Sequence, residues 1–154
     1  MVRVAINGYG RIGRVAHRVI LEKYLSELEV VAINAGSSTD IKGWMYLLKY
    51  DSSYGPIYSM DVSYQEAEPS PILKDLIGYL LIDGKKIPVF SQKDPALLPW
   101  EDLNIDVVIE STGHFTTEEK LKTHLTAGAK AVVLSAPVNP SASSGQGVPT
   151  IVMS

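Results

Sequence analysis

The stretch VRVAINGYGRIGRVAHRVI, residues 2–20, carries the strongest structural signal in this 154-residue sequence. It begins with a run of β-branched and apolar residues from Val2 to Ile6, which is typical of a buried strand. Three glycines follow at positions 8, 10 and 13. Apolar residues then recur at the spacing of one helix face, namely Ile12, Val15, Ala16, Val19 and Ile20. The stretch therefore predicts a strand, a glycine turn and a helix over residues 11–25.

The spacing Gly8-x-Gly10-x-x-Gly13 between a strand and a helix is typical of a dinucleotide-binding turn. In such a turn Gly8 allows the tight bend and Gly10 leaves room for a pyrophosphate, while Gly13 lets helix and strand pack closely. The N–H groups and dipole of the helix start then face the anion. An ordinary turn with incidental glycines is the alternative, and the flanking strand and helix argue against it.

The rest of the chain repeats this alternation. Strands are expected at residues 30–33, 105–109, 131–134 and 150–153, and helices at 40–50, with Ser and Thr residues capping it, and at 116–127, with a Thr116/Glu119 capping box and Gly128 as its stop. Residues 80–90 predict a β-hairpin with an Asp83-Gly84 turn, residues 51–77 are less regular, and residues 138–149 form a loop. Strands that are apolar on both faces predict an α/β fold, a Rossmann-type doubly wound and mostly parallel sheet with a hairpin insertion, in one domain of residues 1–154.

Composition excludes several function classes. The net charge is -3, and no stretch reaches 18 apolar residues, so we expect neither a nucleic-acid partner nor a membrane partner. The sequence contains no cysteine, which excludes disulfides and cysteine nucleophiles within the chain. The three histidines, His17, His114 and His124, stand at no metal-ligand spacing, so we expect surface or packing roles and no metal. These features predict a cytoplasmic protein.

Polar residues follow the predicted strands, where ligands bind in such sheets. Ser111 to Phe115 follows one strand and Ser135 to Pro137 the next, although each could be a plain turn. Glu110, at a strand end, is either an acid or base or a structural hydrogen-bonding group. After the second strand, the acidic residue that usually binds the adenosine ribose is missing, and Ala35 and three hydroxyl residues follow Asn34 instead. Those hydroxyls either cap the next helix or contact the ribose or a phosphate, so the cofactor is NAD or NADP.

The motifs together resemble the phosphorylating glyceraldehyde-3-phosphate dehydrogenase family. The similar segments are AINGYGRIGR (5–14), LLKYDSSYG (47–55), DGKKI (83–87), ESTGHFTT (110–117), GAK (128–130) and SAP (135–137), in the order of the family. Erythrose-4-phosphate dehydrogenases share this pattern, so the sugar stays open. The resemblance implies an N-terminal NAD(P)-binding domain, a homotetramer, and a sugar-phosphate substrate that is bound only with a catalytic half absent from this chain.

The resemblance also implies the cofactor contacts. Main-chain N–H groups of Arg11 and Ile12 would meet the pyrophosphate, and Ser135 would approach the nicotinamide. The complete expected set is Asn7, Gly8, Gly10, Arg11, Ile12, Gly13, Asn34, Ala35, Lys93, Thr112, Gly113, Phe115 and Ser135. Ala35 departs from the family, because similar NAD-using members carry aspartate there.

The family's catalytic cysteine and histidine are not in this sequence, so the chain alone is predicted to be inactive. Its role is either the cofactor half of such an oxidoreductase or a stand-alone dinucleotide-binding module without catalysis. A small reductase of another Rossmann family is disfavoured, since no Tyr-x-x-x-Lys pair follows the glycine loop.

Overall fold

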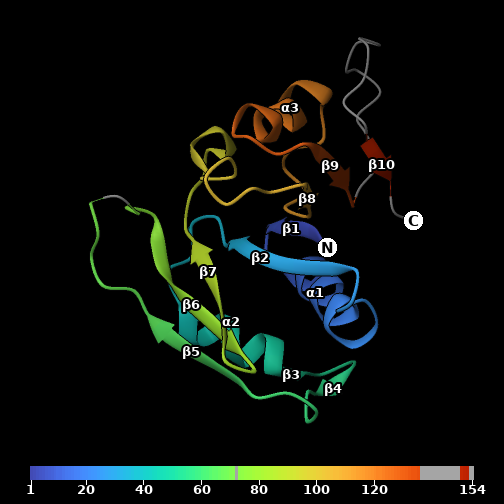
Figure 1. Ribbon diagram of the computed structural model, residues 1–154, viewed down its shortest axis with the longest axis vertical. Helices are drawn as coiled ribbons and strands as arrows, with labels where there is room; N and C mark the ends of the chain where they lie inside the picture. Colours follow the sequence, from blue (N-terminus) through green and yellow to red (C-terminus); the bar gives the residue numbers. More distant parts are fainter. Residues whose placement is uncertain (72, 136–149, 153–154) are drawn as a thin grey trace.

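The computed structural model describes residues 1–71, 73–135 and 150–152, and eight of its strands form one sheet in the order β10-β9-β8-β1-β2-β7-β6-β5 (Figure 1). The first six strands in this order are parallel, β6 pairs antiparallel with β7, and β5 pairs antiparallel with β6. The elements are β1 (Val2–Asn7), α1 (Arg11–Lys23), β2 (Leu28–Asn34), α2 (Ile41–Lys49), β5 (Val62–Glu66), β6 (Leu76–Ile82), β7 (Lys85–Phe90), a 3-10 turn η1 (Pro95–Leu97), β8 (Val107–Glu110), α3 (Glu118–Thr126), β9 (Ala131–Leu134) and β10 (Thr150–Val152), with β3 (Tyr50–Asp51) and β4 (Gly55–Pro56) as a separate pair. The predicted α/β fold is confirmed.

No helix of the described residues is long and apolar enough to cross a membrane.

The sheet is covered on both faces because side chains alternate along each strand. On β1, Val4 and Ile6 join a cluster with α1 and α2, whereas Ala5 joins a second cluster with Trp100 and with Leu121 of α3. In Figure 1, α3 lies beside β9 and α2 beside β5 and β6, toward opposite ends of the sheet. This arrangement is the doubly wound architecture that the sequence predicts.

The antiparallel edge contains one confirmed prediction and one missed strand. Asp83 and Gly84 both have positive φ, at 48° and 82°, as expected for the predicted hairpin turn. Strand β5 lies in the stretch 51–77 that the sequence marks as irregular, and it pairs with β6 from Val62 opposite Ile82. Only Val62 of this strand is buried, so the edge strand lacks a clear apolar alternation.

Both helix caps differ from the sequence prediction. Thr117, and not Thr116, caps α3 by accepting a hydrogen bond from the Lys120 N–H at 3.3 Å. Because Lys120 stands three residues after this cap, the Thr116/Glu119 capping box does not form. At α2 the cap is Asp40, whose Oδ1 accepts from the Gly43 N–H at 2.9 Å, and not a hydroxyl residue.

Gly128 follows α3, as predicted, and packing makes glycine necessary there. Its φ is +114°, and a Cβ at this position would lie 2.6 Å from the Glu101 nitrogen. Gly84 has a similarly positive φ of +82°, but its Cβ would meet nothing within 4 Å. Alanine at either position would be strained by the positive φ, but only alanine at Gly128 would also overlap another part of the chain.

We predict that Gly128→Ala lowers the free energy of unfolding by about 1–3 kcal/mol more than Gly84→Ala does, because only the first overpacks the backbone. Urea unfolding of both variants beside the unaltered chain measures the difference. Equal losses would mean that strain, and not the contact with Glu101, governs this turn.

Candidate functional site

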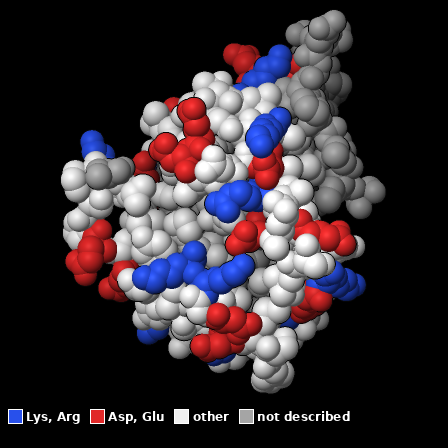
Figure 2. Space-filling view, viewed as in Figure 1, with Lys and Arg blue, Asp and Glu red and all other residues white. Residues whose placement is uncertain are grey.

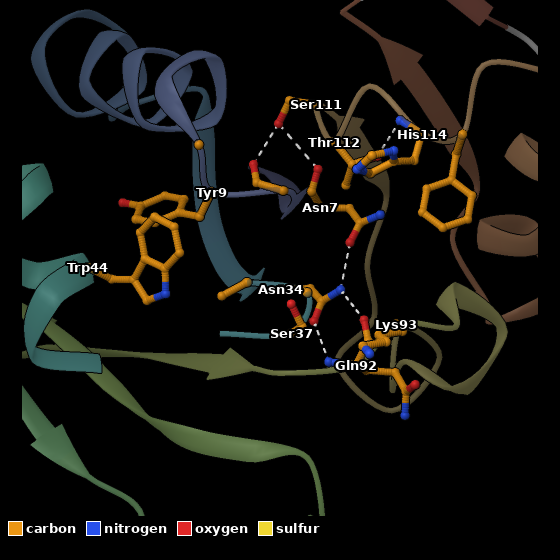
Figure 3. Close-up of a pocket in the computed structure, with 15 residues that line it drawn as sticks. Asn7, Tyr9, Asn34, Ser37, Trp44, Gln92, Lys93, Ser111, Thr112 and His114 are labelled. Carbon is orange, nitrogen blue, oxygen red and sulfur yellow. Dashed lines mark hydrogen bonds between the residues drawn. The ribbon is translucent and has the colours of Figure 1, made fainter. Parts of the chain in front are cut away.

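A pocket of about 520 Å³ opens at the carboxyl ends of β1, β2, β7 and β8 (Figure 3). Eight of the predicted site residues line it: Asn7, Gly8, Gly10, Asn34, Ala35, Lys93, Thr112 and Phe115. The other lining residues are Tyr9, Gly36, Ser37, Trp44, Gln92, Ser111 and His114. Sheets of this kind bind ligands at the same edge, so the fold brings most of the predicted set to one place.

The remaining five predicted residues lie around the pocket but do not line it. Arg11 and Ile12 occupy the first turn of α1 with exposed side chains, and the Arg11 guanidinium bonds the Ser53 hydroxyl. Gly113 has a φ of +76°, and the Ser135 N–H bonds the Glu110 carbonyl at 3.1 Å. Ala136 and Pro137, and the expected loop 138–149, fall outside the described residues. The cofactor contacts of all thirteen predicted residues stay predictions.

The three glycines of the loop, Gly8, Gly10 and Gly13, differ in the space around them. A Cβ at Gly13 would lie 2.1 Å from the Gly8 oxygen, and one at Gly8 would lie 2.7 Å from the Thr112 nitrogen. Both glycines are thus required by close packing. A Cβ at Gly10, in contrast, would meet nothing within 4 Å. Since Gly10 also begins α1 without a side-chain cap, open space faces the unpaired N–H groups of the first turn.

Asn34 forms the floor of the pocket (Figure 3). Its amide donates to Asn7 Oδ1 at 2.7 Å and to the Gln92 carbonyl at 2.8 Å, and it accepts from the Gln92 N–H at 3.0 Å. Both N–H groups and the oxygen of this side chain are therefore engaged within the protein. Asn34 fixes the turn that carries Lys93 and shapes the pocket from below.

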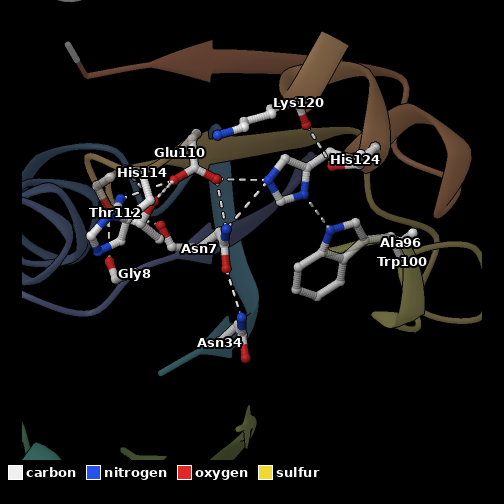
Figure 4. Close-up of polar contacts among 12 residues, drawn as sticks. Asn7, Gly8, Asn34, Ala96, Trp100, Glu110, Thr112, His114, Lys120 and His124 are labelled. Atoms are coloured by element: carbon white, nitrogen blue, oxygen red, sulfur yellow. Dashed lines mark hydrogen bonds and ion pairs between the residues drawn. The ribbon is translucent and has the colours of Figure 1, made fainter. Parts of the chain in front are cut away.

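Glu110 is fully buried and accepts four hydrogen bonds (Figure 4). Asn7 Nδ2 and His124 Nε2 donate to its Oε2 at 2.6 and 2.7 Å. The N–H and hydroxyl of Thr112 donate to Oε1 at 2.9 and 2.5 Å. All four donors belong to the protein itself, which supports the structural hydrogen-bonding role.

The Trp100 indole fixes the tautomer of His124. Trp100 Nε1 can only donate, and it donates to His124 Nδ1 at 3.0 Å. The proton of the imidazole is therefore on Nε2, where it serves Glu110. His124 is a buried hydrogen-bonding residue, whereas His114 is exposed at the pocket. Among the described residues, no group of three His, Cys, Asp or Glu side chains could hold a metal ion.

Tyr9 and His17 form a buried pair beneath the glycine loop. The Tyr9 hydroxyl lies 2.6 Å from His17 Nδ1, and both side chains are almost fully buried. Burial lowers the pKa of His17 to about 3 and raises the pKa of the Tyr9 phenol, so both groups are neutral.

The pocket wall at the end of β2 carries aromatic and cationic groups that sequence reasoning missed. Trp44 lines the pocket, its indole N–H bonds the Ser38 hydroxyl at 3.1 Å, and the Arg14 guanidinium lies 5.9 Å from its ring centre. The only signal in the sequence was that Trp44 stands three residues after Ile41 on one helix face.

On the molecular face in Figure 2, basic and acidic side chains are interspersed, with no broad basic patch.

The model of the family described as glyceraldehyde 3-phosphate dehydrogenase, NAD binding domain, matches residues 2–118. The chain belongs to this family. Glyceraldehyde-3-phosphate dehydrogenases of Thermotoga maritima, Mycoplasma pneumoniae and Eremothecium gossypii are 48%, 47% and 45% identical to it over 136–137 residues. These alignments cover 88–89% of this chain but 36–37% of the relatives' own length. The predicted family is confirmed, and the chain corresponds to the NAD-binding domain of glyceraldehyde-3-phosphate dehydrogenase.

In this domain the buried His17 makes stability depend on pH. The unfolded chain protonates this histidine below about pH 6.5, whereas the folded pKa is about 3. The contribution of the neutral, buried His17 to the free energy of unfolding is therefore complete above pH 6.5 and is lost as the pH drops toward 3. We predict that His17 alone removes about 2 kcal/mol between pH 7.5 and 5.0. Urea unfolding at both pH values measures this loss, which His17→Phe should abolish and the exposed control His114→Gln should keep. An unchanged slope in His17→Phe would contradict the prediction.

Proposed function

We propose that this chain binds an adenine dinucleotide, NAD or NADP, in the pocket of Figure 3, with the pyrophosphate over Gly10. The observation that carries the proposal is the empty space around the Gly10 Cβ position, beside the uncapped start of α1. Main-chain N–H groups and the helix dipole at this point favour an anion. The missing side chain at Gly10 leaves the backbone open to the close approach that a pyrophosphate requires.

The other residues of the pocket would hold the rest of the cofactor. Phe115 offers an apolar ring and Lys93 offers a cation, whereas the Thr112 hydroxyl is already bonded to Glu110. Asn34 and Asn7 orient the floor, because the Asn34 amide donates to Asn7 and Gln92 and the Asn7 amide donates to Glu110. When bound, the nicotinamide would supply the hydride acceptor for aldehyde oxidation.

We further propose that the chain is the cofactor half of an oxidoreductase that converts a phosphorylated aldehyde, such as glyceraldehyde 3-phosphate, to an acyl phosphate. The names of the relatives support this substrate class. The sequence pattern that erythrose-4-phosphate dehydrogenases share leaves that sugar as the alternative. The chain contains no cysteine, so it supplies no thiol for attack on an aldehyde. On this proposal the nucleophile and its base belong to a separate catalytic part, and the chain alone binds cofactor without turnover. A stand-alone binding module without catalysis would show the same binding.

We predict that Gly10→Val weakens NAD binding tenfold or more, about 1.4 kcal/mol, because the new side chain occupies the space for the pyrophosphate. The backbone at Gly10 has a φ of -71° and its surroundings are open, so the free energy of unfolding should change little. Calorimetric titration with NAD measures the affinity, and urea unfolding serves as the control. Equal affinities of variant and parent would overturn the proposed site.

The choice between NAD and NADP depends on the end of β2. Ala35 carries no carboxylate to repel a 2′-phosphate, and Asp40 is turned to the α2 N–H groups as a cap. Arg14, brought across from α1, adds a cation beside Trp44, although it bonds the Tyr9 carbonyl at 3.1 Å. These features support weak discrimination between the two cofactors and no strong preference for NADP.

We predict that Ala35→Asp shifts the preference toward NAD by weakening NADP binding, because a carboxylate there repels the 2′-phosphate. Titration of parent and variant with both cofactors gives the ratio of dissociation constants. Asp40→Asn is the matched control, since it removes a nearby carboxylate that we assign to helix capping and should leave the ratio unchanged. A parent chain that already binds NAD a hundredfold better than NADP would refute this interpretation of the loop.

A further inference from the structure

The pocket wall that follows β2 lacks the carboxylate that usually binds the adenosine ribose. Ala35, Gly36 and Ser37 line the pocket at this wall, and the Ala35 side chain offers no acceptor for ribose hydroxyls. The next carboxylate along the chain, that of Asp40, accepts from the Gly43 N–H at 2.9 Å as the cap of α2. An adenosine bound at this wall must therefore be held by other contacts.

Trp44 is the largest side chain that lines the pocket. It is half-buried, because it packs against the core cluster of α1 and α2 and also faces the pocket. Its Nε1 donates to the Ser38 hydroxyl at 3.1 Å, and the Tyr9 ring meets it edge-on with ring centres 5.8 Å apart. The Arg14 guanidinium lies 5.9 Å from its ring centre. These contacts hold the indole in place, so a ligand that packs against it removes little side-chain entropy.

Trp44 lies on the side of the pocket where the adenosine half of a dinucleotide is expected. Sheets of this kind bind a dinucleotide across the point where the strand order reverses, here beside β1, with the adenosine ribose at the end of β2. Trp44 comes from the helix after β2, whereas Thr112 follows β8 on the other side of β1. Figure 3 shows these two side chains on opposite sides of the pocket.

We propose that Trp44 determines the affinity for the adenosine half, because its pocket-facing surface packs against the adenosine in place of the missing ribose carboxylate. This inference rests on the proposed binding of an adenine dinucleotide. An aromatic ring gains by packing against the flat face of a base and needs no hydrogen bond to do so. NAD and NADP share the same adenosine, so the contact serves both cofactors equally.

Trp44→Leu removes the ring and keeps an apolar side chain. We expect it to weaken the binding of AMP, NAD and NADP by one common factor, about fivefold or more, and to leave nicotinamide mononucleotide unaffected. Calorimetric titration measures the four affinities. Tyr46→Leu is the matched control and should change none of them, because Tyr46 is an exposed aromatic residue of the same helix that does not line the pocket. Ser38→Ala keeps the indole and removes its hydrogen-bond acceptor, so it tests whether Trp44 acts only by holding the loop.

NMR spectra of the unaltered chain give a readout that requires no variant to fold. With AMP bound, we expect nuclear Overhauser effects between the ring protons of Trp44 and the adenosine, and none to Trp100, which is fully buried and does not line the pocket. Absence of the Trp44 effects, equal affinity of Trp44→Leu and parent, or the same loss in Ser38→Ala would each overturn the inference. A parent chain that binds no NAD would overturn the proposed function as well, whereas NAD binding that is indifferent to Trp44 would overturn this inference alone.

Discussion

The buried carboxylate of Glu110 is the interaction on which the geometry of the cofactor pocket depends. A charge with no exposure to water costs several kcal/mol unless hydrogen bonds replace its solvation. Here the donors come from three places: the end of β1, the turn after β8 and helix α3. Each donor must hold its position, because a missing partner would leave the charge uncompensated. The single carboxylate therefore fixes β1, β8 and α3 relative to one another at the edge where the pocket opens.

The polar floor extends across the sheet because, on three neighbouring strands, apolar residues give way to a polar residue at the same level. Asn7 stands opposite Asn34 on one side and opposite Glu110 on the other in the parallel registers. Each of these residues directly follows a buried apolar pair of its strand, such as Ala5 and Ile6 on β1. The apolar parts fill the core between the helix layers, and the polar ends form one hydrogen-bonded row. The register of the parallel strands therefore places this polar row at the bottom of the pocket, with the apolar core directly behind it.

The sequence predicted those features that depend on neighbours along the chain. The glycine turn, the Asp83-Gly84 hairpin and the stop at Gly128 are all set by local backbone conformation, and all three are found. Strand β5 was missed because an edge strand with one buried residue has little pattern to detect. Trp44 and Gln92 reach the pocket through packing between elements distant in sequence from the glycine turn. For the same reason the sequence could place Asn34 at the pocket but could not show that its amide is engaged by Asn7 and Gln92.

The glycine loop contains residues that permit many backbone conformations, but hydrogen bonds and packing hold it in one. The Gly8 N–H bonds the Asn34 carbonyl at 2.9 Å, and its own carbonyl accepts from the Ser111 hydroxyl at 2.7 Å. Tyr9 points into the core, where its hydroxyl meets His17. A ligand that binds such a loop has little conformational entropy to remove, which favours affinity without further contacts. Among the loop glycines, only Gly10 is left with open space around its Cβ position. The packing that immobilises the loop thus also confines the space for an anion to the start of α1.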